Sequence, residues 1–240
     1  FDKSAVNFLS QFDPPAYKIA SFEILDIPLI RHVASIGKPM ILSTGMASRK
    51  EIAEAVTAAR EEGCMGICLL HCTSGYPTPP EESDLLTLPD LIREFGETVG
   101  ISDHTQGTVV SVAAVALGAC VVEKHLTQSR LDGGPDSTFS LEPLEFNQLV
   151  RDVDIAYRSL GSVRSEIRSS EIPQRSLRRS LYAVEEIKVG EAITENNVRS
   201  IRPGLGLSPS ELPKVIGQVA VTTIARGTPL NWNLISGDQL

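Results

Sequence analysis

The feature that most constrains the fold is a pair of short β-type segments, Gly100–His104 and Val121–His125, which both end in a polar cluster with a histidine. Between them, Gln106–Gly118 is rich in Ala and Val and contains no proline, which predicts a helix. A strand–helix–strand unit makes its two strands parallel and places their equivalent ends on one edge of the sheet. The two histidines, 21 residues apart, are therefore predicted to be neighbours at the carboxyl ends of adjacent strands.

This histidine pair has two interpretations. A single histidine in a globular protein is usually a hydrogen-bonded structural residue. Here two of only four histidines, His104 and His125, fall at equivalent strand ends one βα repeat apart. In α/β barrels this edge of the sheet carries the chemistry, so two imidazoles there form a candidate site for a divalent metal ion. At this point both interpretations stay open.

The segments before this unit repeat the same alternation of strand and helix. Strands are predicted at residues 16–20, 40–43 and 66–71, and helices at 26–36, 50–62 and 88–95. Together with the two strands above, this makes five strands in about 125 residues, at the spacing of an α/β barrel. Five strands cannot close an eight-stranded barrel. The pattern predicts either an open parallel sheet or a (β/α)8 barrel with three further βα units before Phe1.

The chain changes character after this α/β part. Residues 141–160 form one predicted amphipathic helix, and residues 162–179 are polar and basic with a proline, which is typical of a linker. Residues 180–240 alternate short strands with glycine turns and contain a glycine-rich loop that begins at Arg202. The predicted organisation is an α/β domain at 1–161, then the linker, then a small β-rich domain.

Composition argues against several classes of function. The net charge is −8 and no basic stretch alternates with aromatic residues, so a nucleic-acid partner is not expected. No apolar run approaches the ~20 residues of a membrane span, and the first residues do not form a charged-then-apolar signal segment. The cysteines at 64, 68 and 72 lack the paired spacing of structural zinc sites and are predicted as small core residues. A reduced, cytoplasmic protein is the simplest expectation.

Further polar residues follow the predicted strands. Lys18 ends the first strand, where a lysine can bind phosphate or carboxylate or form a Schiff base, although it can also be a solvated surface residue. Glu23 lies five residues later, and Asp136 comes from a glycine-containing loop after the last strand. No P-loop, GxGxxG, GxSxG or HExxH motif occurs, which argues against nucleotide, hydride-transfer, serine-hydrolase and zincin chemistry.

Together these motifs resemble the sialic acid synthase family. Seven motifs occur in the family's order: KIASFE (18–23), STGM (43–46), HCTSGYPTP (71–79), SDHT (102–105), EKH (123–125), GPD (134–136) and SLEP (140–143). The segments RSIRPG (199–204) and RGTPL (226–230) resemble the antifreeze-like (SAF) domain of the same family. The resemblance implies the later part of a (β/α)8 TIM barrel, then a linker, then a β-rich SAF domain.

The resemblance implies an enzyme that condenses phosphoenolpyruvate with an N-acylated aminosugar, releases phosphate and forms a nine-carbon 2-keto acid. The motifs look most like those of pseudaminic acid synthases, with N-acetylneuraminate, legionaminic acid and spore coat polysaccharide synthases as alternatives. A non-catalytic carbohydrate-binding protein is the alternative from another class. It stays open because the family's earlier strands carry a further carboxylate and a further lysine, which these 240 residues do not include.

The resemblance also implies roles for ten residues. His104 and His125 would bind a divalent ion, Mn2+ or else Mg2+ or Co2+. The residues implied to bind substrate are Lys18, Ser21, Ser74, Tyr76, Ser102 and Arg202. Those implied to move protons and direct water are Glu23 and Asp136. Many members of the family have Asn where this chain has Ser74.

Arg202 has a particular place in this scheme. The family resemblance implies a domain-swapped homodimer, in which Arg202 from the SAF domain of one chain reaches an N-acyl group in the active site of its partner. The linker is long enough to allow this, at up to ~3.3 Å per extended residue. The alternative is that Arg202 is an ordinary surface residue.

Overall fold

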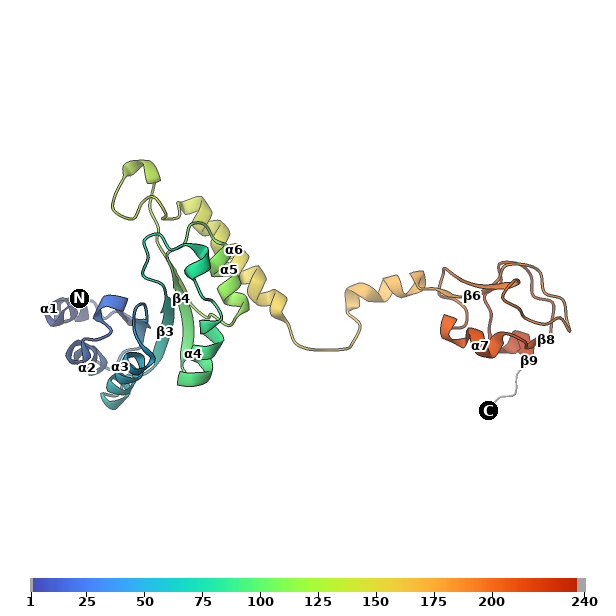
Figure 1. The fold of residues 1–240 in the computed structure, drawn as a ribbon, viewed down its shortest axis with the longest axis horizontal. Helices are drawn as coiled ribbons and strands as arrows, with labels where there is room; N and C mark the ends of the chain where they lie inside the picture. Colours follow the sequence, from blue (N-terminus) through green and yellow to red (C-terminus); the bar gives the residue numbers. More distant parts are fainter. Residues whose placement is uncertain (1, 237–240) are drawn as a thin grey trace. The chain divides into compact units, whose positions relative to one another are not determined.

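The computed structural model describes residues 2–236 and divides into two compact units between Ser162 and Val163. Each unit has its own cluster of buried hydrophobic residues. The first is an α/β unit and the second a small β-rich unit (Figure 1). Within residues 2–236, no helix combines the length and the hydrophobicity needed to cross a membrane.

The first unit is built on one parallel sheet of five strands. The strands are β1 (Tyr17–Ile19), β2 (Met40–Ser43), β3 (Ile67–Cys72), β4 (Thr98–Asp103) and β5 (Val122–Lys124). Each strand pairs with its neighbour in the chain, which is the order that successive βα units produce. The five predicted strands are confirmed, and they form a half-barrel.

Helices connect and cover these strands. The helices are α1 (Lys3–Ser10), α2 (Ile27–Ala34), α3 (Arg49–Glu61), α4 (Thr87–Phe95), α5 (Val109–Ala116) and α6 (Pro143–Leu160). Short 3-10 turns lie at η1 (Ser21–Glu23), η2 (Pro80–Glu82) and η3 (Arg130–Asp132). Helices α4 and α5 pack against β4 (Figure 1). Helix α5 is shorter than the predicted 106–118 because Gly107 and Gly118 take positive φ angles of 75° and 105° at its two ends.

The cysteines only partly match their predicted place in the core. Cys72 is buried at the end of β3, whereas Cys64 and Cys68 are half-buried and Cys120 is exposed. Cys64 lies in the turn before β3 and not in the strand, which explains its exposure. Burial raises the pKa of the Cys68 thiol to about 11. All four thiols are free.

Gly100 lies in β4 close to the Val121 backbone, just before β5. A Cβ atom on Gly100 would lie 2.5 Å from the Val121 carbonyl oxygen and 2.7 Å from Leu70 Cδ2. We predict that Gly100→Ala lowers the free energy of unfolding by about 1–3 kcal/mol, because the methyl group must push packed backbone apart. Urea unfolding measures this. Gly66→Ala is the matched control, because nothing lies within 4 Å of its Cβ position; an equal loss in both variants would contradict the prediction.

The second unit is small and β-rich. Its strands form two antiparallel pairs, β6 (Ser180–Ala183) with β7 (Val198–Ile201) and β8 (Val219–Ala220) with β9 (Ile235–Ser236). Its helical segments are α7 (Leu212–Val215), η5 (Pro209–Glu211) and η6 (Trp232–Leu234). The segment predicted as a linker contains a 3-10 helix, η4 (Ser169–Leu177), with exposed side chains.

Candidate active site

The polar residues of β4 and β5 divide between the two faces of the sheet. In the register of these strands, Ser102 is opposite Glu123, and Asp103 is opposite Lys124. Successive side chains of a strand point to opposite faces. The first pair therefore shares the face on which the two following histidines lie, and the second pair lies on the other face. A hydrogen bond of 2.6 Å from the Ser102 hydroxyl to Glu123 Oε1 joins the first pair.

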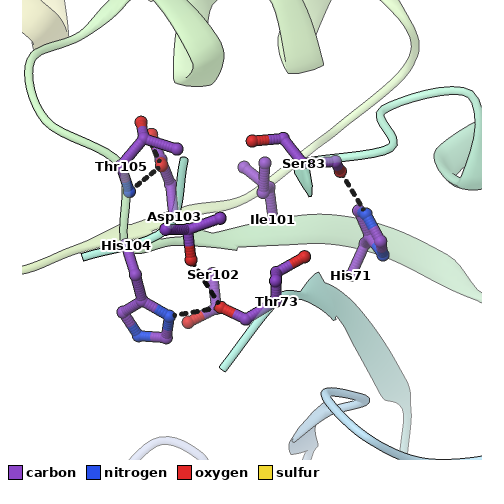
Figure 2. Close-up of a pocket in the computed structure, with 9 residues that line it drawn as sticks. His71, Thr73, Ser83, Ile101, Ser102, Asp103, His104 and Thr105 are labelled. Carbon is purple, nitrogen blue, oxygen red and sulfur yellow. Dashed lines mark hydrogen bonds between the residues drawn. The ribbon is translucent and has the colours of Figure 1, made fainter. Parts of the chain in front are cut away.

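The two histidine rings are neighbours, with centroids 5.2 Å apart. Nδ1 of His104 lies 2.9 Å from the Thr73 carbonyl oxygen, and Figure 2 shows the ring turned toward it. Because a carbonyl can only accept, Nδ1 carries the proton and Nε2 keeps its lone pair. His125 is oriented differently, with Nδ1 3.7 Å from Asp136 Oδ2.

Aromatic rings surround this histidine pair. The Tyr76 ring lies 4.3 Å from the His104 ring and 6.0 Å from the His125 ring, measured between centroids. Phe139 is buried and its ring lies 5.1 Å from that of His125. Tyr76 is half exposed, and its ring packs on the His104 imidazole.

A cationic side chain lies beside this cluster. Lys18 comes from β1, and its Nζ lies 3.3 Å from Glu123 Oε2. Glu123 thus links Lys18 to Ser102, across the sheet from the first strand to the last two. The Lys18 side chain is 31% exposed, which leaves its ammonium group accessible to an anion.

Two serine hydroxyls enclose the backbone at Gly45. The Gly45 N–H donates to the Ser21 hydroxyl at 3.0 Å. A Cβ atom on Gly45 would lie 2.3 Å from Ser74 Oγ and 2.8 Å from Ser21 Oγ. Glycine at this position therefore lets two serine hydroxyls approach the backbone closely, and hydroxyls are among the groups that bind phosphate or carboxylate oxygens.

Cys72 connects the serines to the histidines. Its sulfur lies 3.8 Å from the Ser74 hydroxyl and 3.8 Å from His104 Nδ1. Burial lowers the pKa of His104, but its contacts with Cys72 and with the Thr73 carbonyl outweigh burial and raise the pKa overall. Burial, and then the neighbouring His104, lower the pKa of His125. The two rings therefore differ, with the pKa raised at His104 and lowered at His125.

The structure gathers eight of the ten predicted site residues at the carboxyl edge of the sheet. They are Lys18, Ser21, Ser74, Tyr76, Ser102, His104, His125 and Asp136. Glu23 lies in η1 just after β1, and its Oε2 is buried without a hydrogen-bond partner. Arg202 follows β7 in the second unit.

Sequence reasoning missed some residues that the structure adds to this site, Gly45, Glu123 and Phe139. Glu123 had a usable signal, because it precedes His125 by two positions and so shares its face of the strand. Gly45 lies inside a recognised motif, but its closeness to Ser74 depends on the packing of separate strands. Phe139 had no local signal.

The described residues supply only part of the ligand set that a metal ion needs. The part of the chain that the structure describes contains no group of three or more His, Cys, Asp or Glu side chains that could hold a metal. The His104–His125 pair supplies two nitrogen ligands, and the fixed tautomer of His104 leaves Nε2 available. Imidazole ligands favour a transition-metal ion over Mg2+. Two ligands leave open positions for water and substrate, as in catalytic metal sites.

A parallel half-barrel with its polar side chains at the carboxyl edge defines a TIM-barrel-type protein. Residues 1–165 match the model of the NeuB family, and residues 178–236 match that of the SAF domain. The chain therefore belongs to the NeuB family and carries a SAF domain after the half-barrel. The predicted family is confirmed, and the predicted fold class is confirmed as a five-stranded parallel half-barrel followed by a SAF domain.

Named relatives agree with this assignment. The chain is 37% identical to the pseudaminic acid synthase of Helicobacter pylori over 232 residues, which are 96% of this chain and 68% of that protein. It is 38% identical to the N,N'-diacetyllegionaminic acid synthase of Campylobacter jejuni, over 92% of this chain and 67% of that protein. The crystal structure of the spore coat polysaccharide biosynthesis protein spsE from Bacillus subtilis has a TM-score of 0.64 and 32% identity, and covers 100% of this chain and 72% of its own.

Proposed function

We propose that the protein is a nonulosonic acid synthase, which condenses phosphoenolpyruvate with the aldehyde of an N-acylated aminosugar and releases phosphate. The observation that carries this proposal is the common edge shared by the histidine pair and by the lysine and serine hydroxyls. The enzyme must hold a dianionic phosphate beside an aldehyde, and this edge offers groups for both. The synthases named above, at 37% and 38% identity, support the same reaction class.

The phosphate and carboxylate of phosphoenolpyruvate are proposed to bind on the Lys18 side of the edge. Lys18 supplies a positive charge, Ser21 and Ser74 supply hydroxyls beside Gly45, and Ser102 supplies a hydroxyl beside Glu123. Charge-assisted hydrogen bonds to phosphate are about twice as strong as neutral ones. An anion there would also compete with Glu123 for Lys18, so binding would loosen the Lys18–Glu123 pair.

The aminosugar is proposed to bind over the histidines. His104 and His125 would hold a divalent ion, Mn2+ by the family resemblance, and such an ion polarises the aldehyde oxygen when bound. Tyr76 would pack against the sugar ring. Asp136, beside His125, and Glu23, with its unpartnered carboxylate oxygen, would move protons and orient water.

The choice of aminosugar separates the members of this class. We propose a pseudaminic acid synthase-like specificity, with sialic and legionaminic acid synthases as the alternatives. Purified protein incubated with phosphoenolpyruvate, Mn2+ and each candidate aminosugar will release phosphate fastest with its own substrate. Absence of release with every sugar would favour the non-catalytic carbohydrate-binding alternative. A cytoplasmic location is part of the proposal, supported by four unpaired cysteines, and cell fractionation tests it.

We also propose a homodimer in which Arg202 of one chain donates hydrogen bonds to the N-acyl group bound by the other. Arg202 is exposed in the SAF domain, directly after β7. Arg202→Ala is expected to raise KM for the sugar at least tenfold, since it removes a charged donor, and to leave KM for phosphoenolpyruvate unchanged. Arg226→Ala, at an exposed turn of the same domain, is the control. A monomer in solution scattering, with sugar KM unchanged in Arg202→Ala, would contradict the proposal.

A further inference from the structure

A buried ion pair lies on the opposite face of β4 and β5 from the histidines. Lys124 Nζ is 3.0 Å from Asp103 Oδ2, and their side chains are 1% and 0% exposed. Each partner directly precedes a histidine in the sequence, so the pair cross-links the two strands at their last residues. Figure 2 shows the Asp103 carboxylate and the His104 ring on opposite sides of the chain.

The pair also fixes the backbone around His104. Asp103 Oδ1 accepts from the Thr105 N–H at 2.8 Å and from the Thr105 hydroxyl at 2.7 Å, and Oδ2 accepts from the Ser111 hydroxyl of α5. Lys124 Nζ donates to the Thr105 carbonyl oxygen at 2.5 Å. Thr105, directly after His104, is therefore bonded to both charged groups, and Asp103, directly before His104, is one of the two. Lys124 itself is covalently joined to His125.

Stability alone does not account for a pair this deeply buried. Lysine and aspartate are almost never fully buried unless they are paired. Desolvation of two charges often outweighs their mutual attraction, so packed hydrophobic residues of similar volume frequently give equal or greater stability. What a hydrophobic pair cannot supply is the set of directional bonds to Thr105 and Ser111. The hydrogen bonds to Thr105 and Ser111 therefore serve to orient the backbone around His104.

We infer that Asp103 and Lys124 are positioning residues that set the separation and orientation of the His104 and His125 rings. The inference deepens the proposed function, on which its consequence for metal binding rests. The geometric part concerns the chain alone. Mutation of residues that orient metal ligands without binding the metal typically lowers metal affinity or activity by about 10–100-fold.

The first experiment measures Mn2+ binding by electron paramagnetic resonance in the purified protein. Lys124→Met removes the ammonium group and leaves the Asp103 carboxylate buried without its cation. The double variant Asp103→Asn with Lys124→Met removes both charges, so we expect it to fold even where the single variant does not. We expect both to bind Mn2+ at least tenfold more weakly than the wild type. Ile30→Val, a core change in α2 far along the chain from both strands, controls for a general loss of packing and is expected to bind Mn2+ as the wild type does.

The second experiment is a crystal structure of the double variant, which reads the geometry without any metal. We expect the two rings to depart from their 5.2 Å separation. Unchanged ring positions together with unchanged Mn2+ affinity would overturn the inference. A wild type that neither binds Mn2+ nor releases phosphate would instead contradict the proposed function, and the ring positions in the variant would still decide the inference. Lys124→Arg, which retains the charge, is expected to recover part of the lost affinity.

Discussion

Replacing either histidine of the pair with alanine is expected to lower kcat for phosphate release by about a thousandfold, roughly 4 kcal/mol of transition-state stabilisation. His104→Ala and His125→Ala each remove one of only two nitrogen ligands contributed by the described residues. A single remaining imidazole cannot hold a divalent ion in place over the aldehyde. Steady-state kinetics at saturating substrates, with Mn2+ affinity measured in parallel, check this.

Removal of the metal tests the role of the histidine pair independently. Chelation followed by added Mn2+ is expected to restore the wild type fully and neither alanine variant. His32→Ala is the matched control, because His32 lies on α2 and bonds the Asn7 side chain at 2.9 Å, remote from the site. If His104→Ala kept more than a tenth of the wild-type kcat at the same Mn2+ concentration, the pair would have to be given a structural role.

Local pattern was enough to predict the sheet and the histidine pair. The hydrophobic residues of the strands and helices recur with clear periods. Glycines and capping residues mark the helix boundaries, as Ser48 and Glu51 do at the start of α3. Once strands are parallel and consecutive, their carboxyl ends must meet, so His104 and His125 follow from topology. The domain order followed from the change in composition after the long helix.

Other features depend on contacts between segments far apart in the chain. Helix α1 was not predicted from the sequence, although Asp2 caps its first turn. The closeness of Gly45 to Ser74 joins residues 29 positions apart, in the loops that follow β2 and β3. The buried Lys124 was unexpected because lysine usually marks a surface, and only its register opposite Asp103 explains its burial. Amino-acid composition and the periodicity of hydrophobic residues do not show which distant residues will lie in contact.

Loss of the Lys18 charge is expected to raise KM for phosphoenolpyruvate tenfold to a hundredfold, with KM for the sugar nearly unchanged. A charge-assisted bond to phosphate is worth ~1.5–3 kcal/mol. In Lys18→Ala the Glu123 carboxylate also loses its cation, 3.3 Å away in the wild type, and would then repel the phosphate. Initial rates of phosphate release across a range of phosphoenolpyruvate concentrations give both values of KM.

Lys38→Ala is the matched control for Lys18→Ala. Lys38 is 33% exposed and pairs with Asp13 at 2.8 Å, so the two substitutions remove similar charges from similar environments. Gly45→Ala provides a second variant on the phosphate side, since its methyl group must displace the Ser21 and Ser74 hydroxyls. It is expected to raise KM for phosphoenolpyruvate, and a melting curve shows whether the variant keeps its fold. A rise in KM for the sugar alone, in either variant, would mean that the phosphate binds elsewhere.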